Sequence, residues 1–224
     1  MHHASDWLDL AHQPAVAGIQ PDEAPWAVLS RLSSLMWEPA VIGTVDPRAY
    51  LGACVHIGAG TIVEPGAVIK GPAWIGENCV IRSGAYLREN VVVGNDAVLG
   101  NSSEFKNCVI FDRAEIPHFN YVGDSVVGFR GHLAAGVILS NVRLDRGEVT
   151  IRLNDGSRIA TGLKKFGAII GDEAEIGCNS VISPGSLIGR GALIYPCTHW
   201  NGVLESRHMV QNTQSLRVRP RKTD

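Results

Sequence analysis

Four side chains in the middle of the sequence have the chemical types that anion binding and proton transfer require. Arg88 and Lys106 are two cations, and paired cations of this kind bind phosphate through charge-assisted hydrogen bonds. Glu104 and His118 could serve as a general base, because a carboxylate orients an imidazole and stabilises its charged form. Both functions require that residues distant in sequence meet in space, so the chemistry depends on the fold.

A repeat of six residues organises the chain around these positions. A large aliphatic residue recurs at every sixth position from Leu51 to Leu99, and a smaller residue follows each one by four positions. The pattern returns from Ile170 to Ile194. A period of six fits neither one long helix nor one long strand, and it predicts a solenoid of short strands and turns. Three repeats make a coil of about 18 residues, and coils stack at about 4.8 Å with the aliphatic residue inside.

This period places Arg88 and Lys106 at the same corner of adjacent coils, because three repeats separate them. Two cations about 5 Å apart repel each other unless an anion lies between or beside them. The spacing therefore predicts a phosphate site at this corner. The alternative is that both side chains extend into water.

The repeat is absent from residues 1–40 and is interrupted twice. We expect an amphipathic helix at 25–37 that covers one open end of the solenoid, so that 1–40 form a helical cap and 41–200 the β-helix. The aliphatic phase shifts by four residues within 111–120, which predicts a bulge that carries His118.

The second interruption alternates around Asp155 and Gly156, which predicts a β-hairpin within about 143–165. This hairpin would either contact a neighbouring subunit or form the wall of a pocket. Residues 201–224 are expected to be a tail, whose basic residues either face water or touch an anionic cofactor. Those residues are Arg217, Arg219, Arg221 and Lys222.

Composition narrows the classes of function. A net charge of −2 gives no reason to expect nucleic acid or a membrane surface as a partner, and no apolar run reaches the length of a membrane span. The N-terminus lacks the pattern of a signal peptide. Five cysteines without CxxC spacing are typical of a reduced, intracellular protein, so we expect a cytoplasmic location.

The runs from Gly100 to Lys106 and from His118 to Asp124 together resemble the acetyltransferase domain of the bifunctional enzyme that makes UDP-N-acetylglucosamine. That family has Gly-Asn, Glu-x-Lys and His-x-x-Tyr-x-Gly-Asp at the same separations. The resemblance covers about residues 50–200 and implies an all-β, left-handed parallel β-helix of hexapeptide repeats. We find no residues suited to the nucleotidyl transfer of the family's other domain, so no pyrophosphorylase domain is expected.

The resemblance also implies roles for individual residues. Glu104 and His118 would form the acid–base pair. Beside these implied roles, we expect backbone N–H groups near Ala135 or Cys178 to hold the oxyanion that develops on the acetyl-CoA carbonyl. The positions that would bind the sugar phosphate are Arg88, Lys106, Tyr121, Asn141 and Lys165. The implied function is an acetyl-CoA-dependent acetyltransferase that acts on an amino-sugar phosphate or nucleotide sugar similar to glucosamine-1-phosphate. Transfer would be direct, with His118 as general base, in a homotrimer whose sites lie between subunits.

Three positions depart from the family: His132 replaces an asparagine, Val142 a tyrosine, and Cys178 a serine. These departures leave open a non-catalytic β-helix that binds sugar phosphates or acts as a scaffold. A covalent role for Cys178 is disfavoured because no base is identifiable for it. A zinc enzyme is disfavoured as well, and no metal site is expected. A zinc site on this solenoid would need two histidines only a few positions apart and a third about two coils away, a spacing that His56, His118 and His132 do not have.

Overall fold

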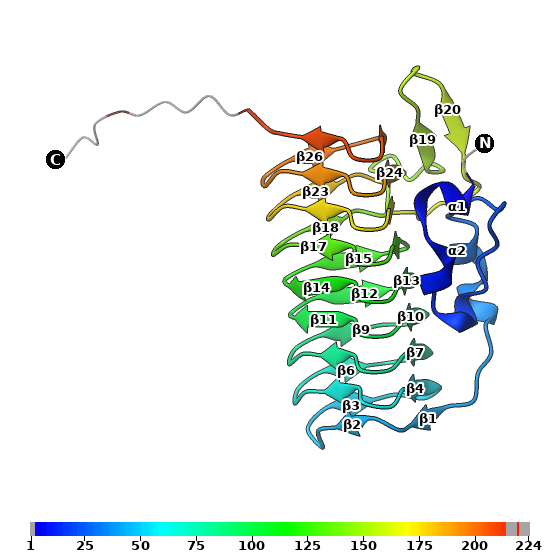
Figure 1. The fold of residues 1–224 in the computed structure, drawn as a ribbon, viewed down its shortest axis with the longest axis vertical. Coiled ribbons are helices and arrows are strands. Elements are labelled where there is room, and N and C mark those ends of the chain that lie inside the picture. The colour runs from blue at the N-terminus through cyan, green and yellow to red at the C-terminus, as the bar shows by residue number, and fades with distance from the viewer. Residues whose placement is uncertain (1–2, 214–218, 220–224) are drawn as a thin grey trace.

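The computed structural model describes residues 3–213 and 219. The chain winds into a solenoid of parallel strands, whose three faces are the sheets A, B and C (Figure 1). Sheet A contains β1 (Ala40–Val41), β4 (Val55–Ile57), β7 (Ala73–Ile75), β10 (Val91–Val93), β13 (Cys108–Ile110), β16 (Val126–Val127), β21 (Ala168–Ile170), β24 (Ser186–Ile188) and β27 (Val203–Leu204).

Sheets B and C run along the same axis as sheet A. Sheet B contains β2 (Thr44–Val45), β5 (Ile62–Val63), β8 (Val80–Ile81), β11 (Val98–Asn101), β14 (Glu115–His118), β17 (His132–Leu133), β22 (Glu175–Ile176), β25 (Leu193–Ile194) and β28 (Met209–Val210). Sheet C contains β3 (Tyr50–Leu51), β6 (Val68–Ile69), β9 (Tyr86–Leu87), β12 (Glu104–Lys106), β15 (Tyr121–Gly123), β18 (Ile138–Leu139), β23 (Val181–Ile182) and β26 (His199–Trp200). The prediction of an all-β fold built as a parallel β-helix of hexapeptide repeats is confirmed.

The repeat works as the spacing predicts. Ala73 lies opposite Val91 and Ile75 opposite Val93, so neighbouring strands of a sheet are three repeats apart in the chain. The side chains of Ile75 and Val93 are fully buried in the interior. The small residue of each repeat is buried too, as at Ala73 and Ala85, which lets the chain turn closely at each corner.

The change of phase has a different cause from the predicted bulge. Glu104 lies opposite Tyr121 and Val122 opposite Leu139, so each of these coils falls one residue short of three full repeats. The shortened corners are at Asn107 and Asp124, both in the left-handed region at φ 47° and 46°. Two missing residues produce the same shift as four extra ones in a period of six. The predicted bulge at 111–120 is therefore wrong, and His118 ends strand β14.

The N-terminal region lies along the flank of the solenoid and not over its end (Figure 1). The predicted helix at 25–37 is wrong in extent, because only short elements form. They are α1 (Ala4–Trp7), η1 (Leu10–His12), η2 (Ala15–Ala17), α2 (Val28–Arg31) and η3 (Leu32–Ser34). The N-terminal region packs on the flank because the outward side chains of sheet A, such as Val92 and Val109, are apolar. They are buried against residues such as Trp26 in a second core.

The predicted hairpin is confirmed, with β19 (Thr150–Arg152) and β20 (Arg158–Ala160) antiparallel. It stands out from the solenoid next to the N-terminal elements (Figure 1). The expected tail is partly wrong, because β27 and β28 continue the solenoid to Val210. Of the tail's basic residues, Arg219 is exposed, while Arg217, Arg221 and Lys222 lie outside the described residues. None of the helices in the described part is long and apolar enough to span a bilayer.

Candidate functional site

A column of cations runs along sheet C. The backbone N–H of Arg88 donates to the carbonyl of Phe105 at 2.8 Å, so Arg88 and Lys106 take equivalent positions on adjacent coils. Lys70 takes the same position one coil earlier, where its N–H donates to the carbonyl of Leu87 at 2.8 Å. Lys70 was not predicted, although it precedes Arg88 by the same three repeats that separate Arg88 from Lys106.

Carboxylates lie between and beside these cations. Arg88 Nη1 is 3.0 Å from Glu104 Oε1, while Glu89 lies 3.6 Å from Arg88 Nε and 3.8 Å from Lys106 Nζ. Burial alone would raise the pKa of Glu89, but its backbone hydrogen bond and the charges of Arg88 and Lys106 outweigh burial and lower it. Partly exposed ion pairs of this kind contribute only about 0.2–1 kcal/mol, so a phosphate can compete for both cations.

Asp124 ties the cation column to Asn141. Its carboxylate accepts hydrogen bonds from Asn141 Nδ2 at 2.5 Å and from Asn107 Nδ2 at 2.9 Å. Asp124 also lies 3.8 Å from Lys106 Nζ. The Asp124 side chain is buried, so these contacts fix the positions of Lys106 and Asn141. From the sequence, Asp124 was recognised only as part of a motif and had no role of its own.

Gly123 makes room for the phenol of Tyr121. A Cβ at position 123 would lie 2.5 Å from Tyr121 Oη and 2.8 Å from Asn141 Nδ2, so any larger residue would displace both groups. Burial raises the pKa of Tyr121, and the nearby carboxylates of Asp124 and Glu104 raise it further. The phenol is therefore neutral and can donate a hydrogen bond. Gly123 was also missed as a functional position.

His118 is exposed at the corner between sheets B and C. Its backbone N–H donates to Asn120 Oδ1 at 3.1 Å, and buried Asn120 in turn donates to the carbonyl of Ala134 at 2.7 Å. In the described part of the chain the imidazole has no hydrogen-bond partner, and Glu104 pairs with Arg88. The structure thus does not join Glu104 to His118, and their role as an acid–base pair stays a prediction. Asn120, which sets this turn, was missed.

His118, Ala135 and Cys178 follow one another along the same corner. Gly136 N–H donates to the carbonyl of His118 at 3.1 Å, and Asn179 N–H donates to that of Ala135 at 2.9 Å. The backbone N–H groups of Ala135 and Cys178 donate to no acceptor among the described residues. Free N–H groups next to a candidate base are suited to hold a developing oxyanion.

The remaining predicted positions lie apart from this corner. Lys165 is exposed, and the N–H of the next residue, Phe166, donates to the carbonyl of Asn141 at 3.0 Å, which places Lys165 near the Asn141 corner. His132 lies on sheet B between Glu115 and Glu175, away from the outward face of sheet C. Among residues 3–213 and 219, no group of three or more His, Cys, Asp or Glu side chains is arranged to hold a metal ion.

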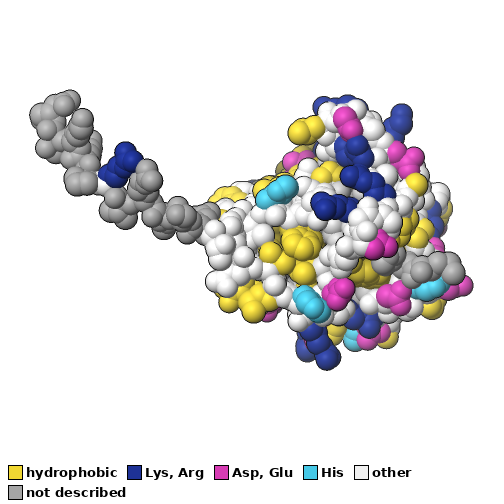
Figure 2. All heavy atoms as spheres, turned by 90° about the horizontal axis from the view of Figure 1, so that it is seen from above, with side chains coloured by type: hydrophobic (Ala, Val, Ile, Leu, Met, Phe, Trp, Pro, Cys, Tyr) yellow, Lys and Arg dark blue, Asp and Glu magenta, His cyan; other side chains and the backbone are white. Residues whose placement is uncertain are grey.

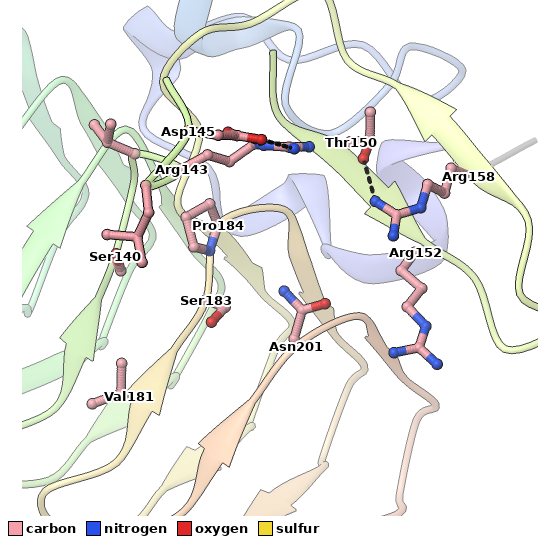
Figure 3. Close-up of a pocket in the computed structure, with 12 residues that line it drawn as sticks. Ser140, Arg143, Asp145, Thr150, Arg152, Arg158, Val181, Ser183, Pro184 and Asn201 are labelled. Atoms are coloured by element: carbon pink, nitrogen blue, oxygen red, sulfur yellow. Dashed lines mark hydrogen bonds and ion pairs between the residues drawn. The ribbon is translucent and has the colours of Figure 1, made fainter. Parts of the chain in front are cut away.

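A pocket of about 540 Å³ opens between sheet C and the hairpin (Figure 3). Its walls include Ser140 and Ser183 on the solenoid side and Arg152 and Arg158 of the hairpin. In the view along the solenoid axis, Lys and Arg side chains gather on the side that carries the hairpin (Figure 2). Val142, one of the departures from the family pattern, lines this pocket.

Known proteins resemble this chain over different lengths. Residues 69–154 match the family model described as GMPPB C-terminal domain. The bifunctional protein GlmU of Methanococcus maripaludis is 32% identical over 190 residues, which are 84% of this chain and 43% of that protein. The putative uncharacterized acetyltransferase YaiX of Escherichia coli is 39% identical over 163 residues, which are 73% of this chain and 68% of that protein.

The chain spans between 23% and 43% of the length of the bifunctional relatives it matches. Among solved structures, the UDP-N-acetylglucosamine acyltransferase from Campylobacter jejuni is 14% identical, with a TM-score of 0.38 over 72% of this chain and 69% of that one.

Proposed function

We propose that this chain, which belongs to the hexapeptide-repeat acyltransferase family, transfers an acetyl group from acetyl-CoA to an amino-sugar phosphate or nucleotide sugar. One observation carries the proposal: Arg88, directly after β9, and Lys106, at the end of β12, occupy equivalent positions on adjacent coils. Tyr121 shares their face of the solenoid, and His118 lies at its edge. A phosphate held by the two cations would direct the attached sugar toward the histidine.

The reaction we infer is a direct transfer. The imidazole of His118 removes a proton from the acceptor amine, whose lone pair attacks the thioester carbonyl of acetyl-CoA. The backbone N–H of Ala135 or Cys178 stabilises the oxyanion, and the C–S bond then breaks and the proton passes to the CoA sulfur. Tyr121, Asn141 and Lys165 are the further groups that we expect to contact the acceptor.

The role of Glu104 would depend on whether a phosphate is bound to Arg88. Its carboxylate now accepts a hydrogen bond from Arg88 at 3.0 Å. A phosphate that binds Arg88 competes for the same guanidinium, so Glu104 would be released to orient the imidazole of His118. Binding of the acceptor would thereby bring Glu104 and His118 together as the acid–base pair.

We also propose a homotrimer with sites between subunits. The N-terminal elements cover the outer face of sheet A, so partner subunits would pack against the faces of sheets B and C, where the candidate residues lie. Light scattering should then give a mass about three times 24.0 kDa. Five free cysteines support a cytoplasmic location, which we propose as well.

The test is release of free CoA from acetyl-CoA in the presence of glucosamine-1-phosphate and a panel of UDP-linked and free amino sugars. His118→Ala should lower kcat by about 10²–10⁴-fold, the usual contribution of a general base. His208→Ala is the matched control, because this exposed histidine contacts the Ser206 carbonyl at 3.0 Å and Glu205 at 3.8 Å, neither of which belongs to the candidate site. If no amino sugar supports CoA release, the enzyme proposal fails.

A second candidate is a β-helix that binds sugar phosphates without turnover. The observation that favours it is the pairing of Glu104 with Arg88, since no other carboxylate in the described part of the chain bonds the His118 imidazole. Saturable binding of glucosamine-1-phosphate without release of CoA would identify this function.

A further inference from the structure

Two arginines face each other across the hairpin. Arg152 of β19 lies directly opposite Arg158 of β20 in the antiparallel register. Like charges in directly opposite positions destabilise an antiparallel pair. A hairpin that keeps both arginines there is suited to bind an anion between them.

No carboxylate among the described residues pairs with either arginine. Arg158 Nη1 is 3.3 Å from Thr150 Oγ1, a neutral group, and Arg152 has no side-chain partner in the described part of the chain. The pocket's third arginine, Arg143, is already paired with Asp145, with Nε 2.9 Å from Oδ1. The hydrogen bond from Arg143 lowers the pKa of Asp145, so that carboxylate stays charged and engaged. The uncompensated charge of the pocket therefore belongs to Arg152 and Arg158.

The packing of the hairpin fixes the direction of these two side chains. Ile151, the residue between Thr150 and Arg152, is fully buried in the second core. Because successive side chains of a strand point to opposite faces, Thr150 and Arg152 point away from that core. Arg152 and Arg158 both line the pocket, in which Ser183 and Asn201 from the solenoid supply further hydrogen-bonding groups (Figure 3). Its volume of about 540 Å³ falls in the range of small-molecule sites.

The pocket continues the candidate site along sheet C. Ser140 of its wall follows β18, which pairs with β15, the strand of Tyr121. At about 4.8 Å a strand, the pocket begins about 10 Å from the level of Lys106 on β12. One extended ligand can therefore reach from the sugar-phosphate residues to the hairpin, with a second anionic group at its far end.

We propose that the hairpin pocket binds the phosphates of a nucleotide through Arg152 and Arg158. The nucleotide is either the phosphorylated adenosine of acetyl-CoA or the diphosphate of a nucleotide-linked acceptor, and both present the same chemistry to the arginines. This inference deepens the proposed function and rests on it for the identity of the ligand, but binding itself needs no turnover.

The test is a titration of the whole protein with three probes: adenosine 3′,5′-bisphosphate, UDP, and adenosine as the uncharged reference. The double variant Arg152→Gln/Arg158→Gln should weaken at least one phosphorylated probe tenfold or more. Arg146→Gln is the matched control, since Arg146 is exposed on the same insertion but does not line the pocket. Both arginines are exposed and their like charges face each other, so the melting temperature of the variant should not fall.

Each arm of the titration has a defined meaning. Selective loss of the bisphosphate assigns the pocket to acetyl-CoA, and selective loss of UDP assigns it to the acceptor. Equal affinities of wild type and double variant for both probes, or no binding of either by the wild type, would overturn the proposal. Glucosamine-1-phosphate, which carries no nucleotide, should bind the double variant as tightly as the wild type, so failure of the hairpin site and failure of the sugar-phosphate site give different results.

Discussion

Asp124 accepts a hydrogen bond from Asn141 at 2.5 Å across adjacent coils of the solenoid. The same buried carboxylate lies 3.8 Å from Lys106 Nζ on the other side. One acidic residue thus holds a candidate phosphate ligand and a candidate sugar ligand in a fixed relation. The site depends on this corner as much as on the residues expected to touch substrate.

Gly123→Ala should damage the site without unfolding the protein. The new methyl group would lie 2.5 Å from Tyr121 Oη and 2.8 Å from Asn141 Nδ2, so both groups must move. We expect KM for the acceptor to rise about tenfold or more, since misplaced contacts of about 1.4 kcal/mol have that effect. Steady-state kinetics measure this, with Gly147→Ala as control because a methyl group there comes no closer than 3.3 Å to an exposed side chain. Unchanged kinetics would exclude Tyr121 and Asn141 from the site.

Lys106→Met should weaken the binding of phosphate-bearing acceptors selectively. The Lys106 side chain is only 15% exposed and its charge is balanced by Asp124 and Glu89, so its loss removes a positioned cation from the column. A charge-assisted hydrogen bond is worth about 1.5–3 kcal/mol, which corresponds to an affinity loss of about 10- to 100-fold. Isothermal titration with glucosamine-1-phosphate measures it, and exposed Lys164→Met is the control. Equal losses in both variants would argue against a phosphate site.

Asn120→Ala should lower the kcat of the folded enzyme, beyond any loss of activity that follows from its lower free energy of unfolding. Its side chain accepts from the N–H of His118 at 3.1 Å and donates to the carbonyl of Ala134 at 2.7 Å, so it fixes the turn that presents the imidazole. Unsatisfied buried partners cost about 1–3 kcal/mol of unfolding free energy. Chemical denaturation and CoA-release kinetics separate the two effects. A fall in activity fully explained by unfolded protein would reduce Asn120 to a structural residue.

The solenoid could be predicted from the sequence because a six-residue period is compatible with few other folds. The aliphatic positions, the hairpin around Gly156 and the stacking of Arg88 on Lys106 follow from spacing alone. The shortened corners at Asn107 and Asp124 were misread, because periodicity cannot distinguish two deleted residues from four inserted ones. The position of the N-terminal region was misread as well, since the apolar outer face of sheet A is visible only once the strands are assigned to sheets.

The identities of the candidate site residues could be predicted from the sequence, but the contacts between their side chains could not. The motif contains His118 and Tyr121, whose types can be read directly from the chain. Nothing in the spacing shows that Glu104 bonds Arg88, that Asp124 joins two coils, or that Gly123 is needed for space. Lys70, in contrast, could have been predicted from spacing, because it precedes Arg88 by the same one-coil separation that connects Arg88 to Lys106.

The five cysteines should divide into two classes of reactivity. Cys54, Cys178 and Cys197 are exposed, while Cys79 and Cys108 are buried. Burial raises the pKa of Cys79 to about 11 and that of Cys108 still higher, and the thiolate is the reactive form. We expect three thiols to react quickly with Ellman's reagent in the native protein and five after denaturation. Acetyl-CoA should slow one of the three, and Cys178→Ser should remove that one; five fast native thiols would contradict the buried assignment.

Tyr121 should make the stability of the protein fall at alkaline pH. Burial and the carboxylates of Asp124 and Glu104 raise its pKa above the ordinary value of 10.0, so the folded state holds the phenol proton more tightly than the unfolded state. That contribution is complete below about pH 10 and is lost as the pH rises through the folded-state pKa. Urea unfolding at pH 9 and pH 11 should therefore show a larger loss of unfolding free energy for the wild type than for Tyr121→Phe. Equal losses in the two proteins would mean that the phenol titrates as it does in the unfolded chain, and that its burial against Asn141 and Gly123 does not hold in solution.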